Sequence, residues 1–245
     1  MKAIIGGTGI DNSEYCRKHA KTVSTPFGDV EYMEKDGIIL LPRHSKGHSV
    51  PPHRINYLAN IEALSKLGVD SVVAIYAVGS ITEKVPFLSY GILSDYMDFS
   101  GRNITFFSDR VKHTDVSNPY DRELSKKLKK YLPEAAEDVV YVCTNGPRFE
   151  TKAEVRAYGM LGGDVVGMTG GTEITLLREK GIRTAGVVYS INWGTGVRKD
   201  IEFPSDEKVE EMSLVVFNAA LSALKDQYGH FREIQEDAPG YSEAL

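Results

Sequence analysis

The stretch Ser71-Val72-Val73-Ala74-Ile75-Tyr76-Ala77-Val78-Gly79-Ser80 decides the fold class that this sequence predicts. It begins with a short apolar run rich in β-branched side chains, which is typical of a buried strand. The strand follows a helix predicted over about 54–67, which ends before Gly68 and gathers its apolar residues on one face: Ile55, Leu58, Ile61, Ala63 and Leu64. An amphipathic helix that leads into a buried strand is typical of an α/β domain.

The same alternation continues along the chain. Further strands are expected at 3–5, 27–32, 37–42, 139–143, 165–167 and 183–189, with a hairpin around 34–37. Further helices are expected at 121–131, 151–161, 172–180 and 204–228. We therefore predict one α/β domain over residues 1–245, with a mixed, mostly parallel central sheet covered by helices and a loosely held tail from about 229.

The composition argues against several classes of protein. The net charge of −5, without a stripe of lysine and arginine, disfavours a nucleic-acid partner, because binding to phosphate backbones needs clustered positive charge. The longest apolar runs are too short to span a membrane. Two cysteines, Cys16 and Cys143, are too few for a secreted disulfide scaffold, and the chain begins with a strand instead of a signal peptide, so we expect a cytoplasmic protein. His48, His53 and His113 lack the spacing of metal ligands, so no metal site is predicted.

Two segments at predicted strand ends suit an anion, and the carboxyl ends of strands are where open α/β sheets bind ligands. Gly6-Gly7-Thr8-Gly9 offers backbone N–H groups and a hydroxyl, although a tight structural turn explains the glycines equally well. Arg43 and His44 offer a fork of donors beside a titratable ring, which suits a phosphate dianion better than a core. The alternative for this second pair is an exposed charge pair.

Two later strand ends suit a flat ligand and a sugar. After the predicted strand at 139–143, Gly146-Pro147 forces a turn, Phe149 offers a face for stacking and Glu150 can accept a hydrogen bond from a ring N–H. The alternative is a loop with a core phenylalanine and a solvated glutamate. After the strand at 165–167, Met168 can pack on a sugar, and the Thr169 hydroxyl, near a helix N-terminus, can hold phosphate.

Taken in order, these segments resemble the purine nucleoside phosphorylases and their methylthioadenosine phosphorylase branch over nearly the whole chain up to the last helix. The matching segments are Gly6-Gly7-Thr8-Gly9, Pro42-Arg43-His44, Asn56-Tyr57-Leu58-Ala59-Asn60-Ile61, Ala77-Val78-Gly79-Ser80, Gly146-Pro147-Arg148-Phe149-Glu150-Thr151-Lys152-Ala153-Glu154 and Gly167-Met168-Thr169. The resemblance implies reversible phosphorolysis, in which inorganic phosphate displaces a purine from C1′ of a nucleoside. Phosphate is then a co-substrate, and no cofactor is needed.

The resemblance also implies a role for each matching residue. The phosphate-binding set is Thr8, Arg43, His44, Tyr76, Ala77 through its backbone, and Thr169; the role of the Tyr76 side chain stays open, because the family has a smaller hydroxyl residue there. Met168 is expected under the ribose. The base-binding set is Phe149, Glu150 and Asn192, with Trp193 and Gly194 beside them, and the residues expected to act in catalysis are Asn192 and His44.

Departures from the methylthioadenosine branch predict the base. That branch has aspartates at the positions of Asn192 and Gly194 and a serine at the position of Glu150. A carboxylate at Glu150 can accept from N1–H of a 6-oxopurine, and the Asn192 amide can donate to O6 and bond N7, whereas adenine has no N1–H. An unmatched buried carboxylate costs about 1–3 kcal/mol or more, so adenosine is disfavoured.

Other features of the site stay open at this stage. A polar 5′ pocket favours inosine and guanosine, and an apolar one favours methylthioinosine. Its expected residues are Ser205 and Asp206, with His113 from a neighbouring subunit. The family implies a homotrimer or a homohexamer. The alternative functions are a 5′-methylthioinosine phosphorylase, a non-catalytic nucleoside-binding protein, and a nucleoside hydrolase, although the sequence shows no calcium-binding aspartate cluster near its amino terminus.

Overall fold

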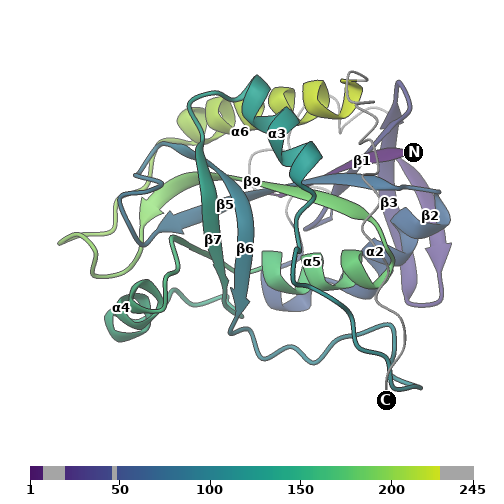
Figure 1. Cartoon of the computed structure of the whole chain (residues 1–245), viewed down its shortest axis with the longest axis horizontal. Coiled ribbons are helices and arrows are strands. Elements are labelled where there is room, and N and C mark those ends of the chain that lie inside the picture. The colour runs from purple at the N-terminus through teal and green to yellow at the C-terminus, as the bar shows by residue number, and fades with distance from the viewer. Residues whose placement is uncertain (8–19, 46–48, 227–245) are drawn as a thin grey trace, which may run out of the picture.

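A computed structural model describes residues 1–7, 20–45 and 49–226, and in these residues nine strands form one sheet (Figure 1). The strand order is β2-β3-β4-β1-β5-β8-β7-β6-β9. The bounds are β1 Lys2–Gly6, β2 Lys21–Thr25, β3 Gly28–Lys35, β4 Ile38–Pro42, β5 Ser71–Ser80, β6 Tyr90–Asp98, β7 Ala136–Cys143, β8 Val165–Gly167 and β9 Arg183–Trp193.

The sheet is mixed, as predicted, and part of it closes on itself. Five of the strand pairs are parallel and four are antiparallel. Because β5 pairs with both β8 and β9, the strands β5, β8, β7, β6 and β9 form a closed circuit. The predicted placement of ligands at strand ends is the one typical of open sheets. The circuit brings the ends of β5, β8 and β9 together, which an open sheet would not require.

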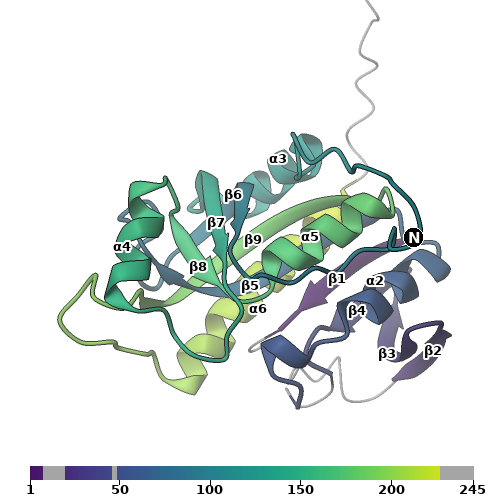
Figure 2. The ribbon, with the colours of Figure 1, turned by 90° about the horizontal axis from the view of Figure 1, so that it is seen from below.

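Helices cover both faces of this sheet. The structure has a 3₁₀ turn, η1 Pro52–Arg54, and the α-helices α2 Tyr57–Lys66, α3 Arg122–Tyr131, α4 Lys152–Met160, α5 Gly170–Glu179 and α6 Asp206–Lys225. α3 and α6 lie on one face and α2 and α5 on the other, while α4 lies at the end of the molecule away from α2 (Figures 1 and 2). Each pair encloses its own apolar core against the strands.

The differences from the predicted elements have local causes. β2 and β6 were not predicted, because β2 is largely exposed and β6 carries polar residues along its exposed half. The helix predicted at 54–67 begins later, because Asn56 caps α2 by accepting from the backbone N–H of Ala59 at 3.1 Å. The predicted tail from 229 lies outside the described residues. No helix in the described part of the chain is long and apolar enough to cross a membrane.

Candidate active site

A pocket of about 260 Å³ lies where the ends of β4, β5, β8 and β9 meet. Eight of the residues singled out in the sequence line it: Arg43, His44, Tyr76, Ala77, Phe149, Met168, Thr169 and Asn192. The structure thus brings together side chains from four strand ends and the loop after β7. Arg43 bonds Ile75 of β5 and Asn192 lies against Gly79, four residues further along the same strand, so the cation lies toward one end of the pocket and the amide toward the other.

The cationic end is set by the parallel pairing of β1 and β4. Gly6 is in register with Pro42, and the backbone N–H of Arg43 donates to the Gly6 carbonyl at 2.8 Å. This pairing places Gly7 against both side chains: a Cβ at Gly7 would be 2.9 Å from an Arg43 terminal nitrogen, Nη1, and 3.3 Å from the ring of His44. The position therefore requires glycine for close approach. Thr8, the next residue in the predicted phosphate set, lies outside the described residues.

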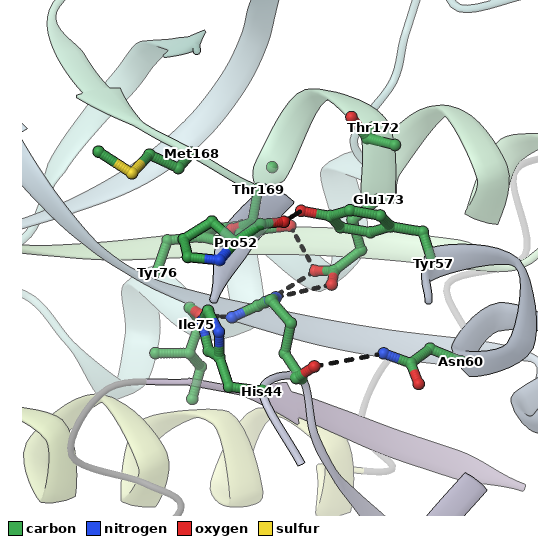
Figure 3. Close-up of polar contacts among 12 residues, drawn as sticks. His44, Pro52, Tyr57, Asn60, Ile75, Tyr76, Met168, Thr169, Thr172 and Glu173 are labelled. Carbon is green, nitrogen blue, oxygen red and sulfur yellow. Dashed lines mark hydrogen bonds and ion pairs between the residues drawn. The ribbon is translucent and has the colours of Figure 1, made fainter. Parts of the chain in front are cut away.

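Arg43 is held by a carboxylate that the sequence analysis missed. Its Nε and Nη2 donate to the two oxygens of Glu173, each at 2.7 Å, and its Nη1 donates to the Ile75 carbonyl at 3.1 Å (Figure 3). Arg43 is only 3% exposed and Glu173 only 1%. Burial alone lowers the pKa of an arginine, but the charge and hydrogen bonds of Glu173 outweigh it, so the pKa of Arg43 lies above its ordinary value.

Glu173 thus already occupies the Nε and Nη2 donors of Arg43. This corrects the expectation that Arg43 presents this pair of donors to phosphate. Only the Nη1 side of the guanidinium faces Gly7. The role of the Tyr76 side chain, which the sequence left open, involves the same carboxylate: its hydroxyl donates to Glu173 at 2.9 Å, and its ring lies 4.6 Å from the Arg43 guanidinium carbon. Burial, followed by the charge of Glu173, raises the pKa of Tyr76, so the hydroxyl stays protonated and donates.

His44 and Thr169 complete this end of the pocket. Nδ1 of His44 lies 2.8 Å from the Val50 carbonyl, which orients the ring, and the Nε2 edge lies toward Gly7. Thr169 is the N-cap residue of α5, yet its side chain makes no capping hydrogen bond and instead lines the pocket. The Tyr141 hydroxyl takes that capping role by accepting from the backbone N–H groups of Thr169 and Gly170 at 3.3 Å each.

At the other end of the pocket, Asn192 is 5% exposed and lies against Gly79. A register shift between Val78 and Gly79 places Asn192 opposite Gly79, and a Cβ at Gly79 would be 3.0 Å from the Asn192 amide nitrogen. That nitrogen donates one hydrogen to the Trp193 carbonyl at 2.9 Å. This bond uses one of the two amide hydrogens, and Asn192 lines the pocket.

Glu150 lies beside this pocket but lines a different hollow. The second hollow measures about 280 Å³ and is bordered by Phe99, Thr144, Asn145, Gly146, Arg148, Glu150, Glu154 and Tyr158. Glu150 is 6% exposed, and one of its oxygens accepts from the Thr144 hydroxyl at 2.6 Å. The alternative of a loop with a core phenylalanine and a solvated glutamate is wrong, because Glu150 is buried while Phe149 is about half exposed.

Several other predicted residues do not line the pocket. Trp193 packs under Arg198, whose guanidinium carbon lies 4.1 Å from the ring, and the Gly194 N–H donates to the Ser80 carbonyl at 2.8 Å. Of the predicted 5′ residues, Ser205 caps α6, and neither Ser205 nor Asp206 lines the pocket. His113, expected from a neighbouring subunit, does not line the pocket of its own chain. Among the described residues, no group of His, Cys, Asp or Glu side chains is arranged to hold a metal ion.

Three pocket features escaped the sequence analysis. Glu173 is an acidic residue in the first turn of α5, which by itself indicates only a favourable helix end. Pro52 and Phe203 also line the pocket, and Phe203 lies beside Phe149 with ring centroids 5.8 Å apart. Phe203 is 52% exposed in an extended segment before α6. No local pattern marks such a residue as part of a site.

The fold and the pocket together define an α/β enzyme with a small-molecule site at its strand ends. A family model described as the phosphorylase superfamily matches residues 2–224. The chain belongs to this superfamily.

Two relatives and one solved structure show which members of the superfamily the chain is similar to. It is 40% identical over 216 residues, covering 80% of each chain, to the 6-oxopurine nucleoside phosphorylase of Pyrococcus furiosus. It is 36% identical over 247 residues, covering 97% of each chain, to the probable S-methyl-5′-thioinosine phosphorylase of Methanocaldococcus jannaschii. A double mutant of the adenosine/methylthioadenosine phosphorylase of Schistosoma mansoni, in complex with adenine, has a similar structure, with a TM-score of 0.82 and 28% identity, covering 91% of this chain and 90% of that one.

Proposed function

We propose that this enzyme catalyses the reversible phosphorolysis of 6-oxopurine nucleosides, giving the free base and ribose 1-phosphate. The observation that carries the proposal is the shared pocket: Arg43, His44 and Thr169 line one end and Asn192 lines the other, with Met168 also in the lining. A sugar that bridges an anion and a base fits this order. The names of the relatives from Pyrococcus furiosus and Methanocaldococcus jannaschii support the same reaction type.

In this proposal, inorganic phosphate lies against the Nη1 side of Arg43, His44, the Ala77 backbone and the Thr169 hydroxyl. The ribose packs on Met168. Breaking the glycosidic bond builds positive charge on the ribose and negative charge on the leaving purine. Phosphate stabilises the positive charge on the ribose and attacks C1′. The second hydrogen of the Asn192 amide bonds more strongly to the leaving purine as the negative charge of the purine grows.

The base preference rests on Asn192 and Glu150. Because Thr144 occupies one oxygen of Glu150, the other oxygen is the acceptor for N1–H of hypoxanthine or guanine. Phe149 lies over the base. Glu150 borders the neighbouring hollow, so the purine in this proposal extends from the pocket of Asn192 toward that hollow. Adenine offers no N1–H, and adenosine leaves the buried carboxylate without a partner.

A second substrate, S-methyl-5′-thioinosine, is favoured by one observation. The pocket residues that have no predicted role toward phosphate, ribose or base include Pro52 and Phe203, both apolar. A methylthio group packs on such side chains, whereas Ser205 and Asp206, the polar residues predicted for a 5′-hydroxyl from this same chain, lie outside the pocket. Relatives named probable S-methyl-5′-thioinosine phosphorylase agree with this candidate.

The proposal includes three expectations that rest on composition and family resemblance. Phosphate is a co-substrate and no further cofactor takes part. The protein works in the cytoplasm. It assembles as a homotrimer or a homohexamer, in which a neighbouring subunit's coil carries His113 toward the 5′ end of the site.

One assay tests the reaction and the substrate together. Release of free base is measured with and without phosphate for inosine, guanosine, adenosine and the methylthio analogues of inosine and adenosine. We expect phosphate-dependent release of hypoxanthine and guanine. Adenine release should be lower by at least about tenfold, because that is the factor expected when a hydrogen bond to a charged group is lost. Release without phosphate indicates a hydrolase, and no release from any substrate indicates a binding protein.

A further inference from the structure

We propose that Glu173, held by Tyr76, is a positioning residue that sets both the orientation of Arg43 and the affinity of the site for phosphate. This inference rests on the proposed phosphate site and concerns residues to which neither the family comparison nor the sequence assigned such a role. It starts from the bidentate contact between Glu173 and Arg43, with both nitrogen to oxygen distances at 2.7 Å.

The first step concerns direction. Glu173 takes the Nε and Nη2 edge of the guanidinium, and the Ile75 carbonyl accepts from Nη1. Three fixed hydrogen bonds leave the planar group one orientation, in which Nη1 lies next to Gly7. Figure 3 shows Glu173 reaching from α5 toward β5, on the side where Thr169 and His44 lie. Arg43 therefore meets an anion through one edge at one angle.

The second step concerns charge. Arg43 and Glu173 are both buried, so in the empty site the arginine is already neutralised by a nearby carboxylate. An incoming phosphate must therefore compete with Glu173 for the positive charge of Arg43. Without Glu173, the empty site holds an unpaired buried cation, and phosphate becomes the group that neutralises it. Ligand binding then stabilises the protein more than it does in the wild type.

The third step concerns Tyr76. Its hydroxyl donates to the same Glu173 oxygen that accepts from Nη2 of Arg43, at 2.9 Å. This bond draws negative charge away from the salt bridge. Removing the hydroxyl leaves a carboxylate that pairs more strongly with Arg43 and frees less of the arginine for phosphate. The two substitutions, Glu173→Gln and Tyr76→Phe, therefore move phosphate affinity in opposite directions.

The test measures the dissociation constant of inorganic phosphate by calorimetry and kcat by base release, on the full chain. For Glu173→Gln we expect phosphate to bind at least about tenfold more tightly, while kcat falls at least about tenfold because the nucleophile is no longer oriented. For Tyr76→Phe we expect phosphate to bind about threefold more weakly, a change within the range of one hydrogen bond. In an Arg43→Gln background, Glu173→Gln should no longer change phosphate affinity, because it acts through the arginine.

Two residues that bond at or to the same helix outside the pocket provide matched controls. Glu179 of α5 accepts from the Thr105 hydroxyl and the Phe106 N–H, and Tyr96 bonds Thr175 of α5 at 2.8 Å. Glu179→Gln and Tyr96→Phe remove equivalent bonds outside the pocket, so they should lower the unfolding temperature without changing phosphate affinity.

Phosphate affinity that is unchanged or weaker in Glu173→Gln overturns the inference, as does an effect that persists without Arg43. If Glu173→Gln does not fold, Tyr76→Phe decides: an unchanged or tighter phosphate dissociation constant overturns the inference. If the wild type binds phosphate as described but releases no base, the proposed function fails while this inference stands. If the wild type binds no phosphate, both fail.

Discussion

The two ends of the pocket, the phosphate end and the base end where we propose that these ligands bind, are built in different ways. At the phosphate end, Arg43, Glu173 and Tyr76 are each at most 3% exposed, and their hydrogen bonds join β4, β5 and α5. At the base end, Phe149 and Phe203 are about half exposed and lie on segments between regular elements. The proposed phosphate site thus consists of buried groups that bond one another, whereas the base end combines the buried Asn192 with half-exposed rings that can change at little cost in stability.

The largest effect is expected for Arg43→Gln, which tests whether the phosphate end is both functional and structural. The substitution leaves Glu173 buried without its counter-ion, so we expect a loss of about 3–5 kcal/mol in the free energy of unfolding. Denaturant unfolding measures it, and calorimetry measures phosphate binding. Stability within 1 kcal/mol of the wild type, roughly the value of an exposed ion pair, contradicts the described contrast between the two ends.

Asn192→Ala is the corresponding change at the base end. We expect the barrier to rise by about 2–4 kcal/mol, as for a lost oxyanion donor. The free energy of unfolding should change far less than for Arg43→Gln, because the amide bonds only the neighbouring Trp193 carbonyl among the described contacts. Steady-state kinetics with inosine measure kcat, and an unchanged kcat argues against a role for Asn192 in stabilising the leaving group.

Gly79→Ala separates the two ends without deleting a polar group. The new methyl group meets the Asn192 amide nitrogen at 3.0 Å, so the amide must move by a few tenths of an ångström. We expect kcat to fall about tenfold, since small misplacements in an active site are costly. Phosphate affinity, measured in parallel, should stay as in the wild type. A variant that loses phosphate affinity and keeps kcat reverses the assignment of the two ends.

Phe203→Ser tests the apolar lining of the 5′ end. If the methylthio group packs on this ring, kcat/KM for methylthioinosine should fall about five- to tenfold relative to inosine, the value of about one buried methylene. Phe27→Ser is a matched control, because Phe27 is also exposed and packs on a second ring, Phe106, outside the pocket. An equal loss of kcat/KM for inosine and methylthioinosine would mean that the Phe203 ring does not contact the 5′ substituent.

The smallest effect concerns pH and the loop that carries Phe149. Hydrogen bonds from Arg148 and from the Thr151 backbone lower the pKa of Glu154 to about 2, in a capping box at the start of α4. A lowered pKa means that Glu154 stabilises the fold fully above its ordinary pKa of 4.5 and loses this contribution as the pH falls toward 2. The unfolding temperatures of wild type and Glu154→Gln should therefore differ at pH 6 and converge between pH 4.5 and 2. A constant difference over this range contradicts the role of the carboxylate charge.

Much of this molecule could be predicted from local patterns. The buried runs at β5 and β9 and the amphipathic face of α2 specify their elements through side-chain periodicity, and the mixed sheet under helices was predicted correctly. β2 and β6 were missed because their exposed or polar residues hide the apolar alternation. Of the eight predicted residues in the pocket, Arg43, His44, Phe149, Met168 and Thr169 were singled out in segments that follow predicted strands, whereas the roles of Tyr76, Ala77 and Asn192 came from the family resemblance.

The sequence by itself determined the α/β elements, the membership of the phosphorylase superfamily and most of the residues around the pocket, since each depends on short-range patterns or on motifs in order. Only the tertiary structure decided that β5 pairs with both β8 and β9, that Glu173 occupies the fork of Arg43, and that Phe203 lies beside Phe149. These are contacts between residues from 54 to 130 positions apart. Their energies come from burial and charge pairing, which no local pattern records.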